Sequence, residues 1–123
     1  MDTKPKVLYV DDEPINLQLF EINFSKKYEV YIAPNGSGGL DILDKHPDIS
    51  VIISDMKMPG MNGIEFIEKA KEKFPNKRYY ILTGFEITPE INSALETGLI
   101  LQYFRKPFNS KKIEAVIENK IID

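Results

Sequence analysis

The sequence predicts an α/β fold in which one five-stranded parallel sheet carries helices on both faces. Five short runs rich in β-branched and aromatic residues alternate with five segments of helical spacing. The first run, 6–10, also lacks polar alternation, as expected of a strand that is buried on both faces. Because parallel strands need crossover connections, which are usually helical and right-handed, this alternation predicts a doubly wound sheet.

The first half of the chain is expected to hold three strands, at 6–10, 29–33 and 49–54. Pro14 suits the first turn of a helix that runs to about residue 27. A weaker helix follows at 38–46. The first helix carries two apolar rows of helical spacing, namely Ile15, Leu19 and Ile22, and Leu17, Phe20 and Phe24.

The second half is expected to continue the same alternation. A helix that carries Ile67, Ala70 and Phe74 is followed by strands at 78–82 and 99–105. Between these strands, Thr88 caps a helix that has a proline in its first turn and stops at Gly98. Asn109 can cap a last helix, whose apolar stripe consists of Ile113, Val116, Ile117 and Ile121.

Composition bounds the class of protein. A chain of 123 residues is long enough for one core, so residues 1–123 are expected to form a single domain with no output domain attached. The net charge is -3 and the basic residues are scattered, so nucleic-acid binding is not expected. The absence of cysteine excludes disulfides and thiolate chemistry. With no apolar leader and no long apolar stretch, we expect a cytoplasmic protein that does not contact membranes.

Polar side chains follow several predicted strands at the point where each strand ends. Asp11 and Asp12 follow the first strand, Asp55 the third and Thr83 the fourth, while Lys106 follows the fifth. The carboxyl ends of parallel strands share one edge of the sheet, where open α/β folds place their sites. The sequence therefore predicts that carboxylates, a hydroxyl and an ammonium meet in one small volume.

Such a cluster suits phosphoryl chemistry. Asp11, Asp12 and Asp55 would repel one another unless a cation lay among them, and hard oxygen ligands favour Mg²⁺. A carboxylate beside the metal can attack a phosphoryl donor and form an acyl phosphate. Lys106 and the Thr83 hydroxyl would then stabilise charge on the phosphoryl oxygens.

These motifs make the chain resemble the receiver domains of two-component response regulators. The resemblance covers essentially the whole sequence, in order and at the expected spacings. The segments that carry it are Val10-Asp11-Asp12-Glu13-Pro14, residues 54–63 (SDMKMPGMNG), Leu82-Thr83-Gly84 and Lys106-Pro107-Phe108. The resemblance implies a flavodoxin-like (βα)5 fold with strand order 2-1-3-4-5.

The resemblance also implies a role for each motif residue. Asp55 would be the phosphoacceptor, and Mg²⁺ or Mn²⁺ would be held by three side chains and one backbone carbonyl, from Asp11, Asp12, Asp55 and Lys57. Thr83 and Lys106 would contact the phosphoryl group, and Tyr103 would turn inward when the domain switches. The bond between Lys106 and Pro107 would be cis.

The partners that the resemblance implies are a sensor histidine kinase or phosphotransfer protein, and a downstream target or fused output domain. The domain would catalyse only its own phosphorylation and dephosphorylation, and so is not expected to be an enzyme. Its output would change at the surface of the fourth helix, fifth strand and fifth helix.

Two departures from the common family pattern are informative. Lys57 and Phe85 stand two residues beyond Asp55 and Thr83, where the family tunes phosphate lifetime, and we expect bulky Phe85 to slow hydrolysis. The apolar run 99–101 precedes Tyr103. It is expected to lengthen the fifth strand inward; the alternative is exposed apolar surface that supports phosphorylation-dependent homodimers or partner binding.

Two other functions remain as alternatives. A degenerate receiver would bind proteins without taking phosphate, although it would be expected to lack one of the key groups, and all are present. A magnesium-dependent phosphatase with an aspartate nucleophile would need a general acid two residues after Asp55, where Lys57 stands. Direct phosphorylation and turnover of an added phosphomonoester separate these functions.

Overall fold

A computed structural model of the protein describes residues 4–84 and 86–119. Phe85 and Ile121, which the sequence analysis singled out, lie outside the described residues. Strands and helices alternate along the chain in this order: β1 (Lys6–Val10), α1 (Pro14–Phe24), β2 (Glu29–Ala33), α2 (Gly36–Lys45), β3 (Val51–Asp55), α3 (Gly63–Lys73), β4 (Arg78–Thr83), α4 (Pro89–Glu96), β5 (Gln102–Arg105) and α5 (Ser110–Ile117).

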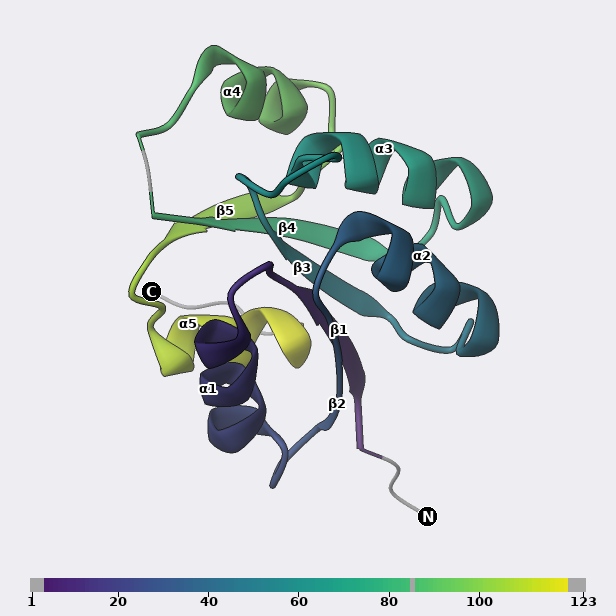
Figure 1. Ribbon diagram of the computed structural model, residues 1–123, viewed down its shortest axis with the longest axis vertical. Helices are drawn as coiled ribbons and strands as arrows, with labels where there is room; N and C mark the ends of the chain where they lie inside the picture. The colour runs from purple at the N-terminus through teal and green to yellow at the C-terminus, as the bar shows by residue number, and fades with distance from the viewer. Residues whose placement is uncertain (1–3, 85, 120–123) are drawn as a thin grey trace.

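The five strands form one parallel sheet in the order β2-β1-β3-β4-β5, which confirms the predicted fold. Helices α1 and α5 cover one face, and α2, α3 and α4 cover the other (Figure 1). The strand order reverses at β1, so the chain leaves β1 and β3 in opposite directions across the sheet. Open α/β sheets form their binding crevice at such a point, outside the carboxyl ends of the strands.

Each face of the sheet has its own hydrophobic core. The larger cluster lies under α2, α3 and α4 and includes Leu8, Ile52, Phe66 and Ile81. The other lies under α1 and α5 and is rich in aromatic rings: Tyr9 stacks on Phe20, and tilted ring contacts continue from Phe20 to Phe24 and Phe108. Because β3 is buried at every residue, both of its faces are used for packing, as expected of a central strand.

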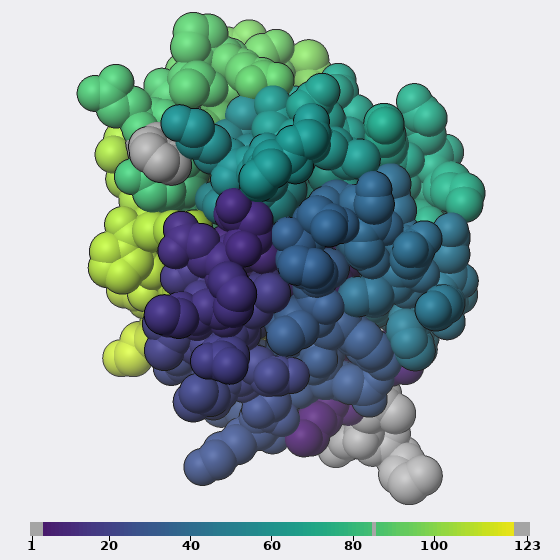
Figure 2. All heavy atoms as spheres, viewed as in Figure 1, coloured from purple at the N-terminus to yellow at the C-terminus, as the bar shows by residue number. Residues whose placement is uncertain are grey.

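The two apolar rows of α1 have different environments. Leu17, Phe20 and Phe24 are buried in the aromatic core. Ile15, Leu19 and Ile22 lie on the opposite row, with exposed fractions of 67%, 46% and 71%. In Figure 2 the indigo surface of α1 lies between the yellow-green region near the start of α5 and the blue region of α2. One face of α1 thus presents apolar side chains to solvent.

The predicted inward extension of the fifth strand is wrong, because β5 begins only at Gln102. The residues before it complete the end of α4: Gly98 adopts a left-handed φ of 79°, and the Ile100 N–H donates to the Ala94 carbonyl. This closure buries the Ile100 side chain under α4 and leaves Leu101 56% exposed. The apolar run is therefore split between core and surface.

Side-chain caps mark the start of the later helices. The Thr88 hydroxyl accepts a hydrogen bond from the Ile91 N–H, and the Asn109 side chain accepts one from the Lys112 N–H, so both predicted caps are confirmed. Asn62 and Glu65 form a reciprocal capping box on α3, which fixes the loop that follows β3. Within residues 4–84 and 86–119, no helix has the length and apolar character needed to cross a membrane.

Candidate functional site

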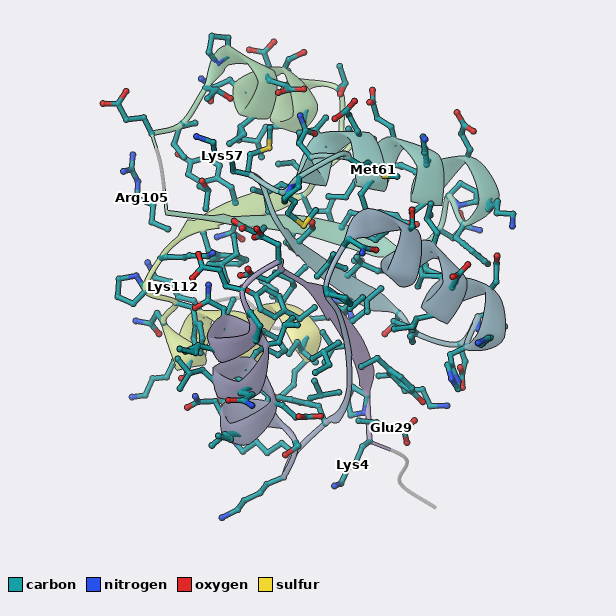
Figure 3. The ribbon with its side chains drawn as sticks, in the orientation of Figure 1. Lys4, Glu29, Lys57, Met61, Arg105 and Lys112 are labelled. Atoms are coloured by element: carbon teal, nitrogen blue, oxygen red, sulfur yellow. The ribbon has the colours of Figure 1, made fainter. Side chains whose placement is uncertain are left out.

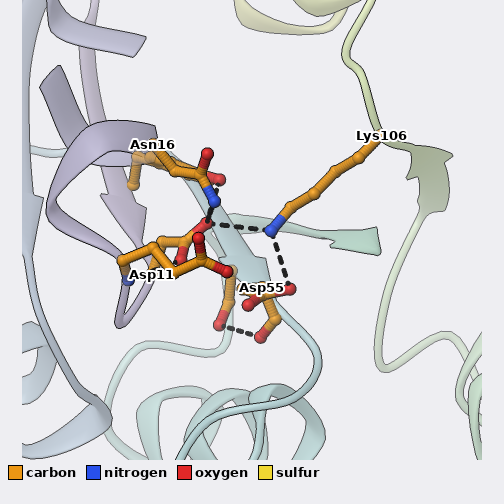
Figure 4. A network of polar contacts seen from close by, with 7 residues as sticks. Asp11, Asn16, Asp55 and Lys106 are labelled. Atoms are coloured by element: carbon orange, nitrogen blue, oxygen red, sulfur yellow. Dashed lines mark hydrogen bonds and ion pairs between the residues drawn. The ribbon is translucent and has the colours of Figure 1, made fainter. Parts of the chain in front are cut away.

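The polar residues at the strand ends meet at the carboxyl edge of the sheet, as predicted. Asp55 is the last residue of β3 and Thr83 the last of β4, while Asp11 directly follows β1 and Lys106 directly follows β5. Val10 pairs with Ser54, so the residues that follow them, Asp11 and Asp55, extend from adjacent strands at the same level. Figure 4 shows the Lys106 side chain reaching across to both carboxylates.

Three carboxylates are close enough to share a cation. Asp11, Asp12 and Asp55 each offer an oxygen, and these atoms all lie within 4.8 Å of one another. Asp11 and Asp55 are buried, whereas Asp12 is exposed at the mouth of the site. The site opens into a hollow of about 580 Å³, whose lining includes Asp12, Asn16, Asp55, Lys57 and Lys106. Carboxylate oxygens are ligands that Mg²⁺ prefers. The open hollow leaves room for the water molecules that this ion usually keeps.

Four groups of the described residues donate hydrogen bonds to the Asp11 carboxylate. Its Oδ2 accepts from the Tyr9 hydroxyl at 2.6 Å, from Asn16 Nδ2 at 3.1 Å and from Lys106 Nζ at 3.0 Å. Its Oδ1 accepts from the Glu13 backbone N–H at 2.9 Å. These hydrogen bonds offset the cost of burying the carboxylate.

Two of these donors were not expected from the sequence, in which Tyr9 has the pattern of strand packing. The Tyr9 ring does pack, since it stacks on Phe20 with ring centroids 4.4 Å apart, and its hydroxyl also reaches Asp11. Burial, followed by the hydrogen bond to Asp11, raises the pKa of Tyr9, so its hydroxyl stays a donor. The available signal was alternation, because residues two apart on a strand share one face. Asn16, on α1, carried no such signal.

Asp55 is in a different environment. It is 4% exposed, and no well-oriented hydrogen bond from the described residues reaches its Oδ1; the Lys106 ammonium lies 3.2 Å away as an ion pair. Burial raises the pKa of Asp55 to about 6, with a smaller upward contribution from the Asp11 charge, and Lys106 opposes both. A buried carboxylate oxygen without a hydrogen bond is suited to bind a cation or to attack an electrophile.

Lys106 joins the two carboxylates. Burial by itself would lower its pKa, but the hydrogen bond to Asp11 and the charges of Asp55 and Asp11 outweigh burial and raise it. The ammonium is therefore charged and is shared between Asp11 Oδ2 and Asp55 Oδ1. The peptide bond from Lys106 to Pro107 is cis.

The backbone of Asp55 is fixed from below by α3. A Cβ added at Gly63 would lie 2.3 Å from the Asp55 carbonyl oxygen and 2.8 Å from Ile81 Cδ1, so only glycine fits here without movement. The Gly63 N–H also donates to the Met56 carbonyl at 2.8 Å. The turn after β3 thus holds the Asp55 main chain tightly while its carboxylate faces the hollow.

The remaining predicted residues lie around this centre. Thr83 is buried, and Tyr103 is half-buried against the core on the α4 side. Tyr103 pairs with Ile81, and Ile81 shares a face of β4 with Thr83, so the two side chains are diagonal neighbours on that face. Lys57 is exposed in the loop after β3, between α4 and the sheet edge, whereas Arg105 and Lys112 extend at the β5 and α5 side (Figure 3). The expected roles of Lys57 and Phe85 in phosphate lifetime stay predictions.

Comparison with known proteins agrees with this geometry. The family model described as response regulator receiver domain matches residues 7–118. The chain is 36% identical to sporulation initiation phosphotransferase F of Bacillus subtilis, over 92% of this chain and 90% of that one. It is 29% identical to a chemotaxis protein CheY homolog of Campylobacter jejuni, over 93% and 90% of the two chains.

A solved structure gives the same result for the fold. Chemotaxis protein CheY4 of Vibrio cholerae superposes with a TM-score of 0.86 at 28% identity, over 97% of this chain and 100% of that one. The strand order, the acidic group at the switch point of the sheet and the family match over residues 7–118 lead to one conclusion. This chain belongs to the response regulator receiver domain family.

Proposed function

We propose that this domain accepts a phosphoryl group on Asp55 in a Mg²⁺-dependent reaction, with a histidine kinase or a phosphotransfer protein as the donor. The observation that carries the proposal is the state of the Asp55 carboxylate. It is buried at the base of an open hollow, beside two further carboxylates and one ammonium, with an oxygen that no well-oriented hydrogen bond from the described residues reaches.

Each residue has a distinct role in the proposed transfer. An Asp55 carboxylate oxygen attacks the phosphorus of the donor, the bond between phosphorus and the donor atom breaks, and an aspartyl phosphate forms. Asp11, Asp12, Asp55 and the Lys57 carbonyl would hold Mg²⁺, which supplies neutralisation of charge on the phosphoryl oxygens. The Lys106 ammonium already lies 3.2 Å from Asp55 Oδ1, so it stands beside the proposed position of the phosphoryl group.

The proposed switch involves Thr83 and Tyr103. Their diagonal placement on one face of β4 and β5 supports a movement in which the Thr83 hydroxyl turns toward the phosphoryl group and Tyr103 takes the vacated space. Phosphorylation would then shift the population between two arrangements of the α4, β5 and α5 surface. In this proposal the domain catalyses only its own phosphorylation and dephosphorylation.

The test is intact mass after incubation with Mg²⁺ and acetyl phosphate. Wild type is expected to gain one phosphoryl group, and Asp55→Asn or wild type in EDTA is expected to gain none. Asp41→Asn, on the exposed side of α2, is the matched control and should behave like wild type. A gain that survives in Asp55→Asn would refute Asp55 as the acceptor.

We also propose that the exposed apolar row of α1 contacts the protein that donates the phosphoryl group. Ile15, Leu19 and Ile22 extend along the helix that leaves the acidic site, and Leu19 borders a hollow of about 350 Å³ together with Lys106 and Phe108. Exposed apolar surface beside a reactive group usually marks a binding site. Ile22→Ser should slow transfer from the partner protein but leave acetyl phosphate labelling unchanged. Gln18→Ser, also exposed on α1, should affect neither.

A further inference from the structure

The Tyr9 hydroxyl is held rigidly against Asp11. The ring stacks on Phe20 with an interplanar angle of 15°, and both rings are almost fully buried between the sheet and α1. Tyr9 lies within β1, between Ile32 on β2 and Ile53 on β3 in the strand register. Ring stacking and strand pairing on both sides therefore fix the hydroxyl, which donates to Asp11 Oδ2 at 2.6 Å.

The three groups that donate to Asp11 Oδ2 differ in their other interactions. Lys106 is shared with Asp55 and, in the proposed transfer, turns toward the phosphoryl group. Tyr9 and Asn16 are neutral, and their side chains donate hydrogen bonds to Asp11. When Lys106 moves away, these two donors remain.

We propose that Tyr9, assisted by Asn16, is a positioning residue that fixes the Asp11 carboxylate for the cation site. This inference rests on the proposed function. With three donors, Oδ2 has no further acceptor capacity, whereas Oδ1 accepts one backbone N–H and keeps a lone pair. The Tyr9 hydroxyl thus sets which Asp11 oxygen is offered to a cation, and it keeps that orientation while Lys106 moves.

The experiment is calorimetric titration of Mg²⁺ into wild type, Tyr9→Phe and Tyr79→Phe, without any phosphoryl donor. Tyr9→Phe keeps the stacked ring and removes only the hydroxyl. Tyr79→Phe is the matched control, since that hydroxyl is also on a buried ring but donates to the Phe74 carbonyl, away from the acidic group. Losing a partner that orients a ligand typically weakens metal binding by 10-fold or more, so we expect about a tenfold rise in Kd for Tyr9→Phe. Tyr79→Phe should bind as wild type does.

Urea unfolding in EDTA separates positioning from stability. If the Tyr9 hydroxyl is purely structural, its removal should lower stability, as in Tyr79→Phe, and the two variants should bind Mg²⁺ equally well. That result would overturn the proposal. Asn16→Ala provides a second measurement on a half-buried residue. It should also raise the Kd for Mg²⁺, but by less than Tyr9→Phe does.

The outcomes also distinguish this inference from the proposed function. Wild type that binds Mg²⁺ but takes no phosphoryl group, with weaker binding in Tyr9→Phe, supports the positioning role and refutes the phosphoacceptor role. Wild type that takes the phosphoryl group, with Mg²⁺ affinity unchanged in Tyr9→Phe, refutes the positioning role alone. Wild type that binds no Mg²⁺ refutes both.

Discussion

Asp11 and Asp55 are two buried aspartates on adjacent strands that share one lysine, yet their surroundings differ. Asp11 accepts four hydrogen bonds, two of them from neutral side chains. Asp55 has the Lys106 ion pair and a pKa raised to about 6, chiefly by burial. A carboxylate whose oxygens accept several hydrogen bonds is stabilised and held in one orientation. A buried carboxylate with too few donors is destabilised, so binding a cation or forming a covalent bond relieves that cost. The same residue type is thus given two functions by the number of its partners.

The largest expected effect comes from removing the charge that the two aspartates share. Lys106→Met leaves two buried carboxylates without their common cation, which should lower the free energy of unfolding by about 3 kcal/mol. Asp55 should be destabilised more than Asp11, because Asp11 keeps three other hydrogen-bond donors. Urea unfolding at pH 7 in EDTA measures the change, and exposed Lys112→Met is the control. A loss below about 1 kcal/mol would mean that solvent already screens this pair.

The second prediction concerns how Asp55 is held in place through its backbone. Gly63→Ala would bring a Cβ against the Asp55 carbonyl, so the turn after β3 must shift, at a cost of about 2 kcal/mol. Acetyl phosphate labelling should also slow, since Asp55 moves relative to Lys106. Gly84→Ala has its nearest contact at 3.6 Å and should be tolerated. Equal stability of the two variants would show that the turn relaxes freely.

The third prediction uses the raised pKa of Asp55. Between about pH 4 and pH 6 the folded state holds a proton on Asp55 that the unfolded chain has lost, so ionisation of this group lowers stability as pH rises through that window. Asp55→Asn should therefore be more stable than wild type by about 1–2 kcal/mol at pH 7 in EDTA. The advantage should shrink toward pH 4. Urea unfolding at both pH values measures it, and an advantage that does not change with pH would contradict the prediction.

The smallest expected effect is on the Asp11 side. Asn16→Ala removes one of four donors from a carboxylate that keeps the others, so the free energy of unfolding should fall by about 1 kcal/mol. Thermal or urea unfolding measures it against Gln18→Ala, an exposed residue of the same helix. If Asn16→Ala lowered the free energy of unfolding more than Lys106→Met does, the comparison between the two aspartates would be reversed.

Much of the fold could be predicted because the signals were local and repeated. Alternating strand and helix patterns, the caps at Thr88 and Asn109, and Gly98 as a stop signal each act within a few residues. The meeting of the polar residues could be predicted for the same reason, since each lies at the end of a strand that parallel topology brings to one edge. The error at 99–101 arose because an apolar run is equally suited to a strand and to the buried end of a helix.

The sequence by itself determined the doubly wound sheet, the family and the set of residues at its carboxyl edge. These follow from periodicity and from motif order, which do not depend on exact packing. Only the tertiary structure decided which apolar row of α1 is buried, that Tyr9 and Asn16 donate to Asp11, and that Asp55 Oδ1 receives no well-oriented hydrogen bond from the described residues. These features depend on contacts of a few ångströms between β1, α1, β3 and the end of β5, and no local pattern in the chain specifies such distances.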